Sequence, residues 1–507
     1  MRARKAALNS ASLLIYVVAF MVSGLILPRL ILTNFGSDYN GVISSINHFI
    51  GYISLLAAGV GGATRAALYK PLAESDNVKI SGIVWATERF FRKIALMYVC
   101  ILVGIAMFYP FLVSGDFDWF FVFTLTLVLG LGTFFLYFFG VTYQTLLIAD
   151  QRAYINYFTR VGAVILNVTI ASYLILAGFE IRLVMLVSSV VFALHPLILY
   201  LYVHKSYKLE RAVQPDNSAI RQRWDAFAHQ LADFVQANVG FIIVTAFLGV
   251  METSVFAVYI FIIRTVRFII VSVAGVGVEA PFGDMLAKSE HKALRRSVVV
   301  NEFLVYGAST LLLACAAVLI VPFVSVYTTT VYDVNYYRPL FAFIACAAEF
   351  TFIARMPAQS LVNAAGHFRQ TRNGAIVEVV INIVLSVILV QFFGLVGVAL
   401  GSLCAMLFRT VQMSLYASNH IVKRSFMVFV RKLVLSLATA AIIIVLASLL
   451  PEMAEVSYFS WILHALPVFG IALGVTGLFA VLFYREELVM LWKLVRKIVG
   501  FSSSQRS

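Results

Sequence analysis

Apolar residues fill the chain in continuous runs of about 20 residues, and short breaks of Gly, Pro, Asn, Asp and charged residues separate these runs. A helix that spans a bilayer needs about 20 predominantly apolar residues. The pattern therefore predicts an all-α polytopic membrane protein with about fourteen transmembrane helices. The break at FFGLVG divides one long apolar stretch into two of these helices. The expected spans are residues 9–33, 40–64, 90–113, 119–147, 154–177, 182–204, 225–249, 253–278, 301–326, 339–363, 373–393, 396–418, 428–450 and 460–484.

The chain also resembles itself at a shift of about 215 residues. AAGVGG at 57–62 matches VAGVGV at 273–278, QTLLIA at 144–149 matches QSLVNA at 359–364, and VILNVTI at 164–170 matches VVINIVL at 379–385. Three matches in the same order predict two six-helix halves in parallel orientation, a transporter design that works by alternating access. The expected parts are a first half at 1–205, a linker at 206–224, a second half at 225–420, and two additional helices with a basic tail at 421–507.

Charge is scarce and unevenly placed. Charged residues make up 12% of the chain, against about 25% in soluble domains. Of the 38 Lys and Arg residues, 31 fall in alternate loops that we assign to the inside, and only Arg182 and Arg338 fall in the others. This asymmetry predicts that both termini and the linker are cytosolic. The net charge of +14 then faces anionic lipid headgroups, and nucleic acid is not needed to explain it.

Five arginines remain, and all fall inside predicted spans: Arg29, Arg264, Arg267, Arg355 and Arg409. Arg264 and Arg267, in FIIRTVRFII at 261–270, lie near the middle of their span and point to one side at i, i+3 spacing. Each central arginine costs about 2.5–3.5 kcal/mol on insertion scales. They either pair with deep acids or bind an anion such as phosphate, to which arginine donates bidentate hydrogen bonds. The other three lie nearer the ends of their spans, where long side chains can reach the interface. All five are candidate ligands for an anionic substrate.

A polar stripe runs along the span at 225–249. Asp225, His229, Asp233 and Gln236 follow steps of 4, 4 and 3 residues, which places them on one helical face. A polar face on a membrane helix favours a water-filled cavity. We expect Asp233 either to relay protons or coordinate a cation, or to neutralise an arginine. Glu349, near the middle of its span, is a second candidate for ion coupling, whereas Glu378, nearer a span end, is interpreted as structural.

The loops offer little room for soluble catalysis. The longest is the linker, and we find no Walker sequence, no GxGxxG that opens a helix, no HExxH and no GxSxG. The four cysteines form no CxxC pair. We therefore predict a protein that is not an enzyme and that uses no metal or cofactor. A membrane-embedded transferase remains an alternative, and the tyrosines of VYTTTVYDVNYYR at 326–338 either hold sugars at the outer mouth or form an interfacial belt.

Three segments resemble polysaccharide repeat-unit flippases of the Wzx type, within the multidrug/oligosaccharidyl-lipid/polysaccharide exporter superfamily. They are FGSDYNGVISSINHFIGYISLLAAGVGGATRAAL at 35–68, QTLLIADQRAYINYFTRVGAVILNVTIAS at 144–172, and RWDAFAHQLADFVQANVGFIIVTAFLG at 223–249. The motifs are diffuse patterns, and the resemblance covers most of the chain.

The resemblance implies a multi-pass protein of the bacterial plasma membrane. It would move an undecaprenyl-pyrophosphate-linked oligosaccharide, as used for O-antigen and lipopolysaccharide, from the inner to the outer leaflet. A cavity between the halves would hold the pyrophosphate and sugars, and the last two helices would accommodate the lipid tail. Membrane lipid and other polysaccharide assembly proteins are the implied partners, and the family's cavity arginines correspond loosely to Arg264 and Arg267. The rival prediction is a cation or drug antiporter, whose cavity would need acids.

Overall fold

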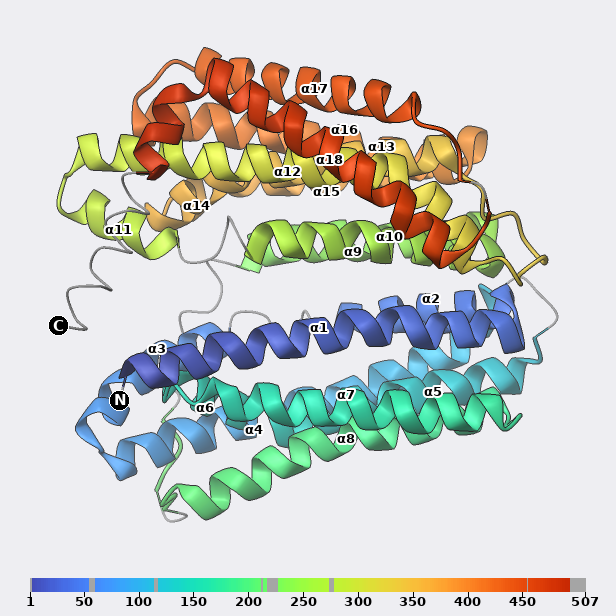
Figure 1. Ribbon diagram of the computed structural model, residues 1–507. Helices are drawn as coiled ribbons and strands as arrows, with labels where there is room; N and C mark the ends of the chain where they lie inside the picture. Colours follow the sequence, from blue (N-terminus) through green and yellow to red (C-terminus); the bar gives the residue numbers. More distant parts are fainter. Residues whose placement is uncertain are drawn as a thin grey trace. The chain divides into compact units, whose positions relative to one another are not determined.

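A computed structural model provides the structure of the chain. It describes residues 2–53, 60–113, 117–210, 213–216, 227–272, 278–453 and 455–492. Within the helices, the side chains of residues 2–4, 6, 7, 53, 63, 66, 227–233 and 280 are outside this description. All the secondary structure assigned in these ranges is helical, and Figure 1 labels the longer helices.

The helices fall where the apolar runs predict them. In the first part of the chain they are α1 Arg2–Phe35, α2 Ser37–Ile53, α3 Val60–Glu74, α4 Asn77–Phe108, α5 Trp119–Phe135, α6 Val141–Ala149, α7 Ala153–Leu176 and α8 Ile181–Ser206. They continue as α9 Phe227–Leu248, α10 Val250–Ile270, α11 Glu279–Ala287, α12 His291–Tyr327, α13 Pro339–Ala354, α14 Met356–Ala364, α15 Phe368–Phe393 and α16 Leu395–Tyr416. The last two are α17 Met427–Ser448 and α18 Tyr458–Phe483.

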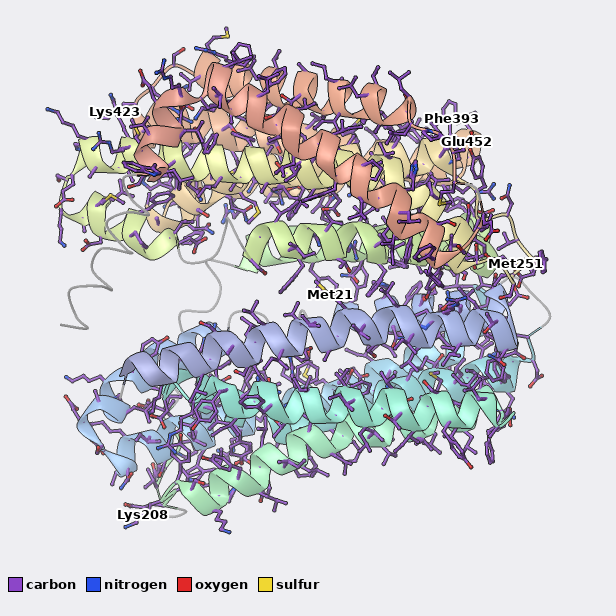
Figure 2. The ribbon with its side chains drawn as sticks, in the orientation of Figure 1. Met21, Lys208, Met251, Phe393, Lys423 and Glu452 are labelled. Carbon is purple, nitrogen blue, oxygen red and sulfur yellow. The ribbon has the colours of Figure 1, made fainter. Side chains whose placement is uncertain are left out.

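Twelve segments of the described chain are long and apolar enough to cross a membrane. They coincide with twelve of the fourteen predicted spans. The two others, 40–64 and 225–249, fall on α2 with the start of α3 and on α9, in which the fully described residues form the shorter apolar helix Phe234–Leu248. A count of fourteen therefore stays a prediction, whereas the multi-pass helical architecture is clear. Exposed apolar side chains such as Phe393, at the end of α15 (Figure 2), suit contact with lipid.

The predicted break at FFGLVG is confirmed. α15 ends at Phe393, α16 begins at Leu395, and Gly394 between them has a φ of +57°. A side chain is strained in that backbone region, so glycine permits the sharp reversal. The two helices then pack very closely, because a Cβ on Gly397 would lie 2.1 Å from the carbonyl oxygen of Leu389.

The helix boundaries repeat at the shift found in the sequence. α6 and α14 begin at residues 141 and 356 and end at 149 and 364, and α7 and α15 begin at 153 and 368, which is a shift of 215 in each case. α4 and α12 begin at 77 and 291, a shift of 214. The internal repeat is therefore a repeat of helix order as well as of sequence. α17 and α18 follow it.

The chain separates into two compact units. Unit 1 comprises Met1–Ala257 with Thr330–Val334, and unit 2 comprises Val258–Thr329 with Asn335–Ser507. The boundary by contacts lies within α10, whereas the sequence repeat places it in the linker at 206–224.

Unit 1 has its main core around α2, α4 and α5, with Ile46, Tyr98 and Leu125 fully buried. α9 and the start of α10 also pack on α2: Gly41 approaches the backbone of Val250 so closely that a Cβ would lie 1.8 Å from its carbonyl oxygen.

Unit 2 is organised around the long helix α12. α13, α17 and α18 all pack against it, and α17 and α18 pack on each other (Figure 1). Small residues such as Ala314, Ala447 and Ala472 line this contact and are almost completely buried. Small side chains allow membrane helices to approach closely, which maximises van der Waals contact between them. The two additional helices are thus an integral part of unit 2.

Candidate functional site

Arg267 on α10 pairs with Glu349 on α13. Its Nη1 donates to both carboxylate oxygens of Glu349, at 3.0 and 3.2 Å. The Arg267 guanidinium also lies 4.8 Å from the ring centroid of Phe352. Arg264, one turn earlier, interacts electrostatically with both Arg267 and Glu349. Ion pairing, one of the two alternatives for these arginines, therefore accounts for Arg267. The same Glu349 carboxylate also interacts with Arg264.

Arg355 and Arg409 share a second glutamate. Arg355 Nη1 lies 2.5 Å from Glu378 Oε1, and Arg409 Nε lies 3.5 Å from Glu378 Oε2. All three side chains are at most 3% exposed. Arg409 also donates to the carbonyl of Thr371 at 2.9 Å. This buried pairing supports the structural interpretation of Glu378, which stays a prediction. The same burial is typical of a structural role for the two arginines, which the sequence had placed among ligands of the substrate and which do not reach towards a span end.

A third glutamate carries two more basic side chains. Glu302 on α12 accepts from Arg424 through both carboxylate oxygens, and Lys432 Nζ lies 3.0 Å from Glu302 Oε2. Glu302 and Lys432 are 4% and 5% exposed. Sequence reasoning missed this cluster because it counted Lys432 with an inner loop. The signal was available, since Glu302 and Lys432 both lie inside the predicted spans 301–326 and 428–450.

The three clusters share one stoichiometry. Glu302, Glu349 and Glu378 each face two basic side chains, so three carboxylates meet six cations among the described residues of unit 2. Burying a charge is costly unless it is paired. The pairing lowers that cost.

The remaining predicted site residues are less informative. Arg29 is partly buried on α1, directly after Pro28. Gln236 is buried on α9, at 8% exposure. The side chains of His229 and Asp233 are outside the described part, as is Asp225 altogether. A role of this stripe in ion coupling therefore stays a prediction.

The tyrosine-rich segment 326–338 shows both exposed and buried rings. Tyr332 and Tyr337 are 89% and 62% exposed, whereas Tyr327 and Tyr336 are buried. Asp333 accepts from the backbone N–H of Ser37 at 2.6 Å and from its hydroxyl at 2.7 Å, which caps the start of α2. Both alternatives for the exposed tyrosines, sugar contact and interfacial belt, stay open.

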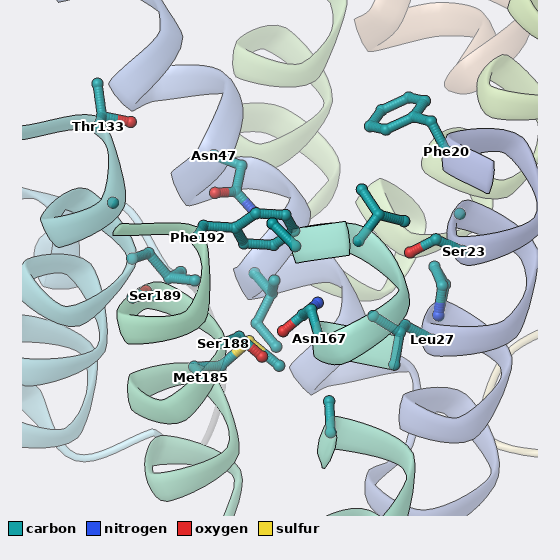
Figure 3. Close-up of a pocket in the computed structure, with 18 of the residues that line it drawn as sticks. Phe20, Ser23, Leu27, Asn47, Thr133, Asn167, Met185, Ser188, Ser189 and Phe192 are labelled. Carbon is teal, nitrogen blue, oxygen red and sulfur yellow. The ribbon is translucent and has the colours of Figure 1, made fainter. Parts of the chain in front are cut away.

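A largely apolar pocket of about 520 Å³, with several polar side chains in its wall, lies inside unit 1. Residues of α1, α2, α5, α7 and α8 line it, and Figure 3 shows Ser23 and Leu27 of α1, Asn167 of α7 and Ser188 and Phe192 of α8 around it. None of the described lining residues is an Asp or a Glu. Sequence reasoning missed this site because it examined α9 and α10 for chemistry.

The pocket contains one arginine and one histidine. Arg160 on α7 lies with its guanidinium 5.5 Å from the ring centroid of Tyr16 on α1. His195 on α8 is 5% exposed, and its Nε2 lies 3.1 Å from the amide oxygen of Asn156. The sequence analysis counted Arg160 with an inner loop, and the structure corrects this. Its position within the predicted span 154–177 was the signal.

Comparison with known proteins rests on structure alone. No protein-family model and no curated protein matches the chain. Among solved structures, lipid II flippase MurJ in an inward closed conformation is 13% identical, with a TM-score of 0.68, and the match covers 94% of this chain and 100% of that one. The chain has the fold of MOP-superfamily transporters.

Two further structures support this assignment of the fold. A multidrug resistance MATE family transporter in an inward-facing conformation is 14% identical, with a TM-score of 0.61, over 80% of this chain and 95% of that one. A MOP superfamily transporter from Pyrococcus furiosus, described as having a binding pocket of reverse polarity, is 13% identical, with a TM-score of 0.57, over 84% and 97%. At these sequence identities the similarity shows the fold alone. That fold agrees with the superfamily to which the sequence resemblance pointed.

Proposed function

We propose that the protein is a flippase that moves a polyprenyl-pyrophosphate-linked oligosaccharide, such as an O-antigen repeat unit, between the leaflets of a bacterial plasma membrane. The charge of the described interior carries this proposal. Six basic side chains face three carboxylates in unit 2, and the pocket of unit 1 has no carboxylate among its described lining residues. An anionic, sugar-bearing substrate suits that charge. In this proposal the chain works by alternating access and its termini are cytosolic.

Arg264 and Arg267 are the proposed pyrophosphate ligands. Both face Glu349 in the described part of the chain: Arg267 pairs with it, and Arg264 interacts with it electrostatically. A pyrophosphate carries several negative charges and accepts bidentate hydrogen bonds from guanidinium groups, which suits two arginines one helical turn apart. Arg29, on α1, is a further candidate, while Asp233, His229 and Gln236 stay candidates for coupling to an ion gradient.

A drug or cation antiporter is the second candidate. The observation in its favour is the fold shared with the multidrug MATE structures. A cationic substrate calls for acids in the binding site, and the described pocket of unit 1 offers an arginine instead. We therefore rank the flippase first.

Translocation in proteoliposomes tests the proposal. A labelled undecaprenyl-pyrophosphate disaccharide would be incorporated, and a membrane-impermeant lectin would measure the sugar that reaches the other leaflet. The variant Arg264→Ala with Arg267→Gln and Glu349→Gln removes the cluster without leaving a lone buried charge, and we expect it to lower the rate by about tenfold or more. Arg182→Ala, at an exposed arginine paired with Glu180, is the matched control. Absence of translocation by the native protein would refute the flippase, and wild-type translocation by the triple variant would refute Arg264 and Arg267 as pyrophosphate ligands. Saturable transport of an organic cation instead would favour the antiporter.

A further inference from the structure

The pocket of unit 1 contains a hydrogen-bond acceptor that its own fold does not satisfy. The side chain of Asn167 on α7 is among the pocket-lining residues, and the residue is 3% exposed. Its Oδ1 has no hydrogen-bond partner among the residues that the structure describes. Buried polar atoms are nearly always paired, so an exception at a cavity wall indicates a ligand that completes it. Figure 3 shows the Asn167 amide directed into the pocket, with Ser188 and Leu27 nearby.

Two prolines add backbone acceptors to the same pocket. Pro28 lies inside α1 and Pro196 inside α8, and both line the cavity. A proline within a helix lacks the N–H that would bond the carbonyl four residues earlier. The carbonyls that lose their helical donor are those of Gly24 and Phe192, and both residues also line the pocket. Asn167 and the two residues whose carbonyls lose their usual helical donor thus line one cavity, from α1, α7 and α8.

Donors and apolar surfaces complete the wall. Arg160 is a permanent cation, and Ser23 and Ser188 bring hydroxyls that can donate or accept. Tyr16 and Phe20 contribute rings from α1. A lipid tail would leave the polar atoms unsatisfied, and a cation would face Arg160 without a carboxylate among the described lining residues. A sugar ring matches this mixture, because each hydroxyl both donates and accepts while its C–H face packs on aromatic rings.

We propose that this pocket in unit 1 binds a sugar residue, neutral or bearing a carboxylate, through Asn167, Arg160 and the carbonyls freed by Pro28 and Pro196. Its volume lies in the range of small-molecule sites, about 300–1,000 Å³. The assignment of this sugar to a lipid-linked oligosaccharide rests on the proposed function, whereas the binding itself does not. The pocket would then select the glycan, and the arginines of α10 would hold the pyrophosphate.

Equilibrium binding to the full chain in lipid nanodiscs tests this site directly. The probes are radiolabelled glucuronate, glucose and glucosamine, each with and without sodium chloride. We expect saturable binding of glucuronate and glucose and much weaker binding of cationic glucosamine. Asn167→Leu should lower the affinity for both glucuronate and glucose by about tenfold, because the amide oxygen no longer accepts a hydrogen bond from a hydroxyl. Arg160→Gln should lower the affinity for glucuronate by about tenfold and change the affinity for glucose by less than about threefold.

Thr126→Val is the matched control. Thr126 is a fully buried polar residue of α5 in the same unit, bonded to its own helix at Val122 and absent from the pocket wall. Sugar binding should survive this change. Three results would overturn the proposal: no saturable sugar binding by the native protein, native affinity for the sugars in the Asn167 and Arg160 variants, or a preference for glucosamine.

The two proposals fail separately. The triple variant at Arg264, Arg267 and Glu349 should lose translocation but keep glucuronate binding. Sugar binding without translocation by the native protein refutes the flippase and leaves the pocket. Translocation without sugar binding refutes the pocket and leaves the flippase.

Discussion

Buried charges in unit 2 divide into those that hold the fold and those that remain candidates for the substrate. Arg355 and Arg409 belong to the first group, because both are buried against Glu378. Removing one partner from a buried pair leaves an uncompensated charge, which is far more costly than losing a surface ion pair. The residue that both arginines share is therefore the most sensitive position of the cluster.

We expect Glu378→Leu to destabilise the protein by about 3–5 kcal/mol, since it leaves two buried guanidinium groups without their carboxylate. Thermal unfolding in detergent would measure the loss. Glu452→Leu, at an exposed glutamate of the loop before α18, is the control and should unfold like the native protein. A Glu378→Leu variant with native thermal stability would show that the pairing contributes nothing to the fold.

Glu349 separates the two roles of Arg267. Its carboxylate accepts two hydrogen bonds from the Arg267 guanidinium, so it competes with any phosphate for the same donors. If Arg267 is a substrate ligand, Glu349→Gln should tighten binding of inorganic pyrophosphate by about tenfold, because the competing charge is gone. Isothermal titration calorimetry in nanodiscs would measure this. Weaker binding by Glu349→Gln would instead mean that the carboxylate positions Arg267 for its ligand, against the competition that we infer.

The helices were easier to predict from the sequence than the ion pairs between them. Hydropathy located the apolar stretch of α15 and α16, because lipid demands continuous apolar helices, and the glycine in FFGLVG marked the break that Gly394 permits. The partners of Arg267 and Arg355 were not predictable, because an ion pair across two helices depends on rotation and depth that sequence spacing does not determine. Arg160 was counted with an inner loop and Asn167 was not singled out, although their separation of seven residues places both on one helical face.

The hairpin of α15 and α16 makes a prediction at the scale of elements. Gly397→Ala would put a methyl group where the backbone of Leu389 lies, so the helices must move apart. We expect this substitution to lower the unfolding temperature and to reduce the free energy of unfolding by about 1–3 kcal/mol. Gly477→Ala on α18 is the matched control, because no atom lies within 4 Å of its added Cβ. That change should be neutral or stabilise by about 0.5–1 kcal/mol, as alanine favours a helix over glycine. Equal unfolding temperatures for the two variants would contradict the close packing.

At the scale of the whole molecule, the open question is orientation in the membrane. The basic residues divide 31 to 2 between the two sets of loops, which predicts that the linker and both termini are cytosolic. Unit 2 is consistent with this division: Lys423, before α17, lies at one end of the unit, and Glu452, after α17, lies at the other (Figure 2). The basic loops before α12 and α17 should therefore face the anionic inner leaflet, and the acidic loop before α18 should face outward.

Single cysteines in a background without the four native ones test this orientation. Ser289→Cys, in the exposed turn between α11 and α12, should react with a membrane-impermeant maleimide only after the cells are permeabilised. Glu455→Cys, exposed before α18, should react on intact cells. Five candidate crossings separate the two positions: α12, α13 with α14, α15, α16 and α17. An odd number of crossings places the two positions on opposite sides of the membrane. Labelling of Ser289→Cys on intact cells with none at Glu455→Cys would invert the topology, and with it the direction in which the proposed flippase loads its substrate.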